Sequence, residues 1–195
     1  TWSVVTLFPG RHPVTALSVA LAPIAQLDER SLAKQIVEDP QAVVSLLRRG
    51  LGDRAGLVLF VDQLEELATV GDPTESAAVD LLLTRLSANV PGVRLFATAR
   101  VDLLTKLARL PGLGEEISRS LYILRPLTPE RIHEVIVGPA EATGIRFESQ
   151  QLVDTLVLTT ANASGGLPLL QFALAELWEA RDLETGVITE KALES

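Results

Sequence analysis

The chain has 195 residues, of which 47% are hydrophobic, and 25 acidic against 17 basic residues give it a formal net charge of -8. This length and hydrophobicity suit one well-packed core, or a core with a small helical appendage, and exclude a disordered tail. The acidic balance argues against general binding of nucleic acid or anionic membrane. The absence of cysteine excludes disulfides and thiolate metal sites, and two histidines far apart in the sequence argue against a zinc cluster. With no apolar run of membrane-spanning length, these features predict a cytoplasmic protein.

Strands and helices alternate along the first part of the sequence. In chain order we expect a strand at Trp2–Leu7, helices over Pro13–Leu27 and Pro40–Arg49, a strand at Leu57–Val61, a helix over Glu75–Ala88, a strand at Val93–Thr98, a short helix that holds Leu103, Leu104 and Leu107, and a last strand at Ser120–Leu124. Continuous apolar runs such as Leu57–Val61 are typical of strands buried on both faces. The order predicts an α/β core in which all four strands form one parallel sheet with helices on both faces.

The character of the sequence changes after Leu124. The segment Pro126–Glu130 is typical of a linker that begins a helix, with Thr128 as the N-cap and Pro129 at the first helical position. From there to about Arg181 the pattern is helical. We therefore place a domain boundary near Pro126.

The first candidate site follows the apolar run that ends at Val61. A carboxylate such as Asp62, at the carboxyl end of a buried strand, lies where α/β sheets bind ligands, and it can hold Mg²⁺ beside a nucleotide phosphate. A second acid close by, such as Glu65 or Glu66, can orient the attacking water. Asp62 and Glu65 also fit a capping box for the next helix, and the residues alone leave these two interpretations evenly balanced.

Two further segments allow a chemical or a purely structural interpretation. Arg100, after the strand that ends at Thr98, could reach a phosphate at the same edge of the sheet, but a surface ion pair with Asp102 is favoured on the residues alone. The segment Gly165–Pro168 leads into a strongly apolar helix, and an ordinary junction between a loop and a core helix is favoured there.

The sequence lacks the two best-known catalytic loops. None of the 13 glycines is followed by lysine, so the chain contains no phosphate-binding G-x-x-x-x-G-K-[ST] loop. It also contains no G-x-S-x-G nucleophile elbow. His12 and His133 are expected in a loop and on a solvent-facing helix position.

Taken in order, five segments resemble the novel STAND NTPases of bacteria, which are ATP-dependent signalling switches. The chain resembles this family's strand after the phosphate-loop helix, its Walker B signature, its sensor strand and arginine, and its helical lid with the GxP region, at Trp2–Gly10, Val61–Leu67, Thr98–Leu104, Gly138–Ala140 and Gly166–Trp178. The resemblance covers nearly the whole chain, and the strings D-Q-x-E-E and L-P-L-L-Q-F-A-L-x-E-L-W are specific.

The resemblance implies a fold with three parts. These are an N-terminally truncated P-loop NTPase core at residues 1–125, a helical lid at 126–164, and the start of a winged-helix-like segment at 165–195. It implies that Asp62 is the Mg²⁺ site, that Glu66 and Glu65 are catalytic acids, and that Arg100 and Pro168 contact the phosphate and the adenine side of ATP or ADP. The missing phosphate loop, together with the absence of methionine, leads us to expect an excised and inactive fragment. Gln63 stands where many P-loop NTPases carry a catalytic acid, so hydrolysis is expected to be slow even in the parent protein.

The function implied is a nucleotide-binding switch and oligomerisation module of a larger signalling protein. Its expected partners are the other domains of that protein and further copies of itself, without nucleic acid or membrane. The alternative is a catalytically silent scaffold with an NTPase fold. A DNA-binding regulator is a third interpretation, but the acidic charge and the lack of a basic recognition helix count against it.

Overall fold

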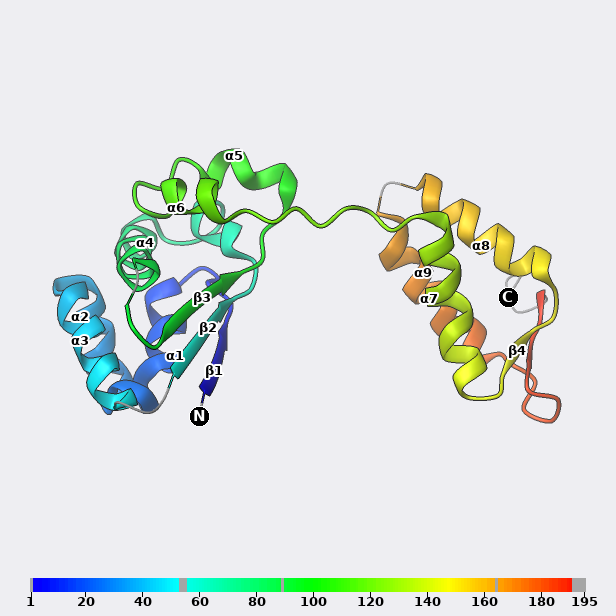
Figure 1. Ribbon diagram of the computed structural model, residues 1–195, viewed down its shortest axis with the longest axis horizontal. Helices are drawn as coiled ribbons and strands as arrows, with labels where there is room; N and C mark the ends of the chain where they lie inside the picture. The colour runs from blue at the N-terminus through cyan, green and yellow to red at the C-terminus, as the bar shows by residue number, and fades with distance from the viewer. Residues whose placement is uncertain (1, 53–55, 89, 164, 191–195) are drawn as a thin grey trace. The chain divides into compact units, whose positions relative to one another are not determined.

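The computed structural model describes residues 2–52, 56–88, 90–163 and 165–190 (Figure 1). The chain forms two compact units, Thr1–Ile123 and Leu124–Ser195. The division between them falls close to the boundary that the sequence predicts near Pro126.

The first unit contains a parallel sheet of three strands. The strands β1 (Trp2–Leu7), β2 (Gly56–Val61) and β3 (Val93–Ala97) lie in the order β1-β2-β3, with β2 in the centre. Leu7 pairs with Val61, and Val61 pairs with Ala97. The carboxyl ends of all three strands therefore meet at one edge of the sheet, which we call the rim. Three of the four predicted strands are confirmed.

Helices follow each of the first two strands and continue after β3. In chain order they are α1 (Pro13–Ala25), α2 (Glu29–Glu38), α3 (Pro40–Leu51), the 3-10 helix η1 (Leu64–Ala68), α4 (Pro73–Ser87), the 3-10 turn η2 (Val101–Leu103), α5 (Leu104–Leu107) and α6 (Leu113–Ser120). Several begin at a side chain that satisfies free backbone donors: Asp28 accepts from Ser31 N, Asp39 from Ala42 N, and Asp72 from Thr74 N and Glu75 N. The helices α2 and α6 were not predicted from the sequence.

The helices cover one face of the sheet. Consecutive parallel strands joined by right-handed crossovers place their connecting helices on the same side. On that side Leu57, Leu59 and Val61 are fully buried in a core shared with α1, α3 and α4. On the opposite side Trp2, Val4 and Phe96 are 54%, 68% and 59% exposed. The small parallel sheet flanked by helices is confirmed, but within the described residues the expectation of helices on both faces is wrong.

The predicted last strand, Ser120–Leu124, is also wrong. Ser120 is the last residue of α6, and residues 121–128 have no regular secondary structure. Tyr122 and Leu124 are 84% and 83% exposed. An apolar run becomes a strand only when a neighbouring strand pairs with its backbone, and no described strand pairs with this one.

The second unit is a small helical unit with its own core. It contains α7 (Pro129–Ala142), β4 (Arg146–Phe147), α8 (Gln150–Asn162), α9 (Gly166–Glu179) and β5 (Val187–Ile188), and β4 pairs with β5 in parallel. Thr128 caps α7 by accepting from Arg131 N, with Pro129 at the first helical position, as predicted. Residues assigned to the lid and to the winged-helix-like segment share one buried cluster, which comprises Ile132, Ile136, Leu152, Val153, Leu156, Val157, Leu170, Leu177 and Ile188.

The helices of both units are short or interrupted by polar residues. Among the residues that the structure describes, none forms a helix with the length and apolar character needed to span a bilayer.

Candidate functional site

Asp62 lies at the centre of the rim, directly after β2, and is half-buried. Its carboxylate accepts a hydrogen bond from the hydroxyl of Thr98, the residue that follows β3. The same hydroxyl oxygen accepts from Gln63 N at 3.0 Å, and Leu64 N donates to the carbonyl of Thr98 at 2.9 Å. The end of β3 thus fixes both the side chain of Asp62 and the turn that follows it.

The capping-box interpretation of Asp62 is wrong. The residue that precedes η1 is Gln63, whose backbone is left-handed at φ 57°, and no side chain caps this 3-10 helix. Glu65, the other expected member of the box, bonds elsewhere. The carboxylate of Asp62 accepts from Thr98, after the neighbouring strand β3, and does not cap the helix η1 that follows it.

The role of Thr98 is not predicted from the sequence, where this residue is only the end of the strand before Arg100. A signal was available, because Val61 and Ala97 are paired and each of the next residues, Asp62 and Thr98, begins the loop after its strand. Asp62 and Thr98 therefore lie side by side at the ends of two parallel strands, where a hydroxyl can donate to the carboxylate.

Glu65 and Glu66 form hydrogen bonds to the loops after two different strands, β3 and β1. Glu65 is 4% exposed, and its Oε2 accepts from Arg100 N in the loop after β3, at 3.3 Å. Glu66 is half-buried, and its Oε2 accepts from Gly10 N in the loop after β1, at 2.8 Å. The segment after β2 is therefore bonded to the loops on both sides of it. The role of these glutamates as catalytic acids stays a prediction.

Arg100 forms the surface ion pair that the residues alone favoured. Its Nε and Nη2 donate to the two carboxylate oxygens of Asp102 at 3.1 and 2.8 Å. Both side chains are largely exposed, at 69% and 58%. The hydrogen bonds and charge of Asp102 raise the pKa of Arg100, and the hydrogen bonds from Arg100 lower the pKa of Asp102. A phosphate that approached Arg100 would compete with Asp102 for it.

The rim offers a magnesium ion one carboxylate. No group of three or more His, Cys, Asp or Glu residues in the described part of the chain could hold a metal ion by itself. Mg²⁺ in nucleotide sites is bound through one or two carboxylates and completes its shell with phosphates and water. Asp62, beside the hydroxyl of Thr98, fits such a partial site, and a complete protein cage is not present among these residues.

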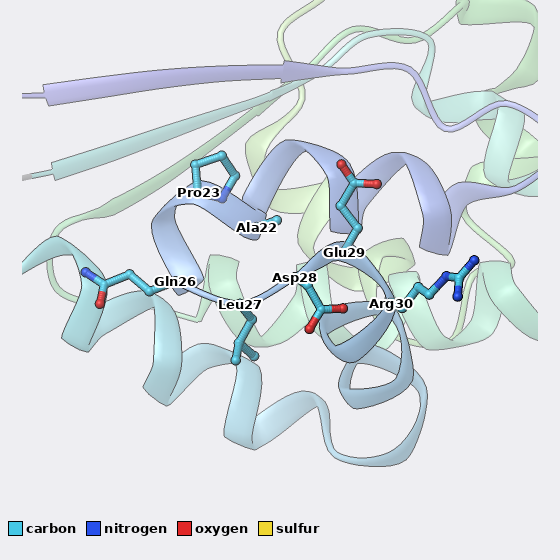
Figure 2. Close-up of a pocket in the computed structure, with 7 residues that line it drawn as sticks. All are labelled: Ala22, Pro23, Gln26, Leu27, Asp28, Glu29 and Arg30. Carbon is cyan, nitrogen blue, oxygen red and sulfur yellow. The ribbon is translucent and has the colours of Figure 1, made fainter.

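An open hollow elsewhere in the first unit does not have the character of a site. It lies where α1 ends and α2 begins, and it is lined by Ala22, Pro23, Gln26, Leu27, Asp28, Glu29 and Arg30 (Figure 2). Figure 2 shows that Asp28, Glu29 and Arg30 point in different directions. Binding sites for small molecules need a few polar groups that converge, and these do not.

Pro168, the remaining predicted site residue, lies in the second unit. It falls in the first turn of α9, after Gly165, whose backbone is left-handed at φ 77°. This agrees with the expected junction between a glycine turn and a core helix. Its contact with the adenine side of a nucleotide stays a prediction.

A parallel sheet flanked by helices, with an acid and a hydroxyl at its carboxyl-end rim, places the first unit in the class of α/β proteins. Within that class, the family model described as Novel STAND NTPase 1 matches residues 1–195, and the chain belongs to this family. Membership of this STAND and P-loop NTPase family supports a nucleotide-binding signalling module in general. No curated protein matches the chain.

Proposed function

We propose that this chain is the ATP-binding switch and oligomerisation module of a larger cytoplasmic signalling protein in bacteria. The observation that carries the proposal is the rim, where Asp62 is fixed by Thr98 at the carboxyl end of the central strand. The family match supports the same class of function. Exchange or hydrolysis of the nucleotide would then shift an equilibrium between two states of the larger protein.

In this scheme two residues of the first unit face the nucleotide. Asp62 holds the hydrated magnesium ion, which supplies charge neutralisation to the phosphates when bound. Arg100 exchanges its ion pair with Asp102 for a phosphate oxygen, which its fork geometry suits. The phosphate loop, with its backbone N–H groups and lysine, has to come from sequence outside these 195 residues.

The isolated chain should consequently bind Mg-ATP weakly or not at all. Four carboxylates lie on the rim or beside it, those of Asp62, Glu65, Glu66 and Asp102, and without the lysine they repel the phosphates. Isothermal titration calorimetry of this chain, beside the longer protein with its phosphate loop, tests the proposal. Tight binding to the longer protein supports the proposal, and no binding there contradicts it. Micromolar affinity in this chain would contradict only the expectation that binding needs the phosphate loop.

A silent scaffold is the alternative that one observation favours. Arg100 is already paired with Asp102, and Glu65 and Glu66 already hold backbone donors, so each predicted chemical group has a structural partner. A longer protein that contains an intact phosphate loop and still does not bind Mg-ATP would establish the scaffold function.

A further inference from the structure

The segment after β2 is attached to the loop after β1 at several points. Glu66 accepts from Gly10 N at 2.8 Å, and Asp72 N donates to the carbonyl of Arg11 at 2.9 Å. Three residues further along the chain, Glu75 contacts the ring of His12 and accepts from Val14 N at the start of α1, both at 3.1 Å. The loop after β1 therefore takes its position from the segment after β2.

Glu66 contacts the turn at Gly10, which has no side chain and presents its backbone N–H. Gly10 has φ +60°, a left-handed conformation that strains residues with a side chain, and its turn presents the N–H to the carboxylate. Gly10 of the turn Phe8-Pro9-Gly10 and Glu66 of the D-Q-L-E-E string are 56 residues apart in the sequence, and this contact links the two motifs. The second glutamate of the string and the glycine of the turn are thus two halves of one interaction.

The order of the strands places Glu66 on the wrong side for a base. The proposed function puts the phosphate at Arg100, on the β3 side of Asp62, whereas Glu66 bonds to the loop on the β1 side. Glu65 does face the β3 loop, but it is 4% exposed and bonded to the backbone of Arg100. A general base has to lie within hydrogen-bond reach of the attacking water.

We infer that Glu65 and Glu66 are positioning residues: Glu66 fixes the Phe8–Gly10 turn, Glu65 fixes the Arg100 loop, and together they hold both neighbours of Asp62 in register. Neither removes a proton from water. This inference rests on the proposed function for its consequence on turnover, while the contact between Glu66 and Gly10 can be tested without it.

The decisive comparison is Glu66→Gln against Glu66→Ala. Glutamine keeps an oxygen that accepts from Gly10 N but is not a base, so a positioning role predicts that phosphate release by the longer protein stays within about threefold of the unaltered protein. Alanine loses the contact, and a displaced loop lowers turnover by about a hundredfold. If Glu66 were the general base, both variants would lose activity alike, by about 10²–10⁴-fold, and that result overturns the inference.

A second measurement needs only the 195-residue chain. Hydrogen exchange at the amide of Gly10 should be unchanged in Glu66→Gln and about tenfold or more faster in Glu66→Ala. Unchanged exchange in Glu66→Ala overturns the inference, whatever the turnover. If the longer protein neither binds nor hydrolyses ATP, the proposed function fails while the exchange result still decides the role of Glu66. The matched control is Glu115→Ala on α6, whose side chain is 81% exposed, and it should change neither readout.

Discussion

A single hydroxyl decides how Asp62 is presented. Thr98 donates to its carboxylate and accepts from Gln63 N, so the acid and the turn after it are fixed by the same atom. Such a preorganised carboxylate can meet a hydrated cation without rearrangement, which is what electrostatic stabilisation of a reaction requires. Because Thr98 donates to a single carboxylate oxygen, the negative charge of Asp62 can be removed while this hydrogen bond is kept.

Asp62→Asn in the longer protein removes the charge and keeps an oxygen that accepts from Thr98. We expect its melting temperature without nucleotide to change little, while Mg-dependent phosphate release falls by about a hundredfold or more. Phosphate release and a melting curve, measured on the same samples, check this. Asp28→Asn, at the cap of α2, is the matched control, because asparagine caps a helix about as well as aspartate. Unaltered turnover in Asp62→Asn would remove the magnesium assignment.

Asp102 should titrate below its ordinary value of 3.8, because Arg100 stabilises its charged form. Since the pKa is lower in the folded than in the unfolded state, the contribution of the pair is present above about pH 4 and is lost as the pH falls through the folded-state pKa. A pH titration of the carboxyl carbon by NMR measures the pKa directly. In Arg100→Ala it should return toward the ordinary value, and an unchanged titration curve would show that Arg100 is not the cause.

Two helices of the first unit are joined by one buried carboxylate. Asp80 on α4 is 3% exposed and accepts from Gly112 N at 2.9 Å and Leu113 N at 2.8 Å, the free donors at the start of α6. Backbone donors at a helix start that lose their partner in a buried place destabilise the fold.

Asp80→Ala should lower the free energy of unfolding by about 2–3 kcal/mol, the order expected for buried donors that lose a charged acceptor. Asp80→Asn keeps a neutral acceptor and should cost less. Urea unfolding of the 195-residue chain gives both values. A loss in Asp80→Ala no larger than that in the exposed variant Glu115→Ala would show that α6 does not depend on this contact.

Elements with a complete local signal were predictable from the sequence, and elements that depend on a partner were not. The run Leu57–Val61 is a strand because it is apolar throughout and is buried between two neighbours, whereas the similar run at Ser120–Leu124 has no described neighbour. The acid at Asp62 could be placed from the strand end alone. The partners of Glu65 and Glu66 could not, because the left-handed Gln63 and the tight 3-10 turn after it set their directions.

Between the two units the chain offers an exposed protease site. Residues 121–128 have no regular structure, and Tyr122 is 84% exposed. Brief digestion with chymotrypsin should cut first after Tyr122, whereas trypsin should spare Arg125 because Pro126 follows it. Mass spectrometry of the early products identifies the bond. Earlier cleavage inside α4 or α8 would show that one of the units is less stable than this segment.

The sheet can accept further strands at both of its edges. Its strands follow one another in chain order, and within the described residues both β1 and β3 keep one side without a strand neighbour. Any further strand added in parallel to either side would leave the helices of the existing core in place, since they already occupy a single face. Its carboxyl end would arrive at the same rim as Asp62, so a loop carried by that strand would be delivered beside the acid by topology alone.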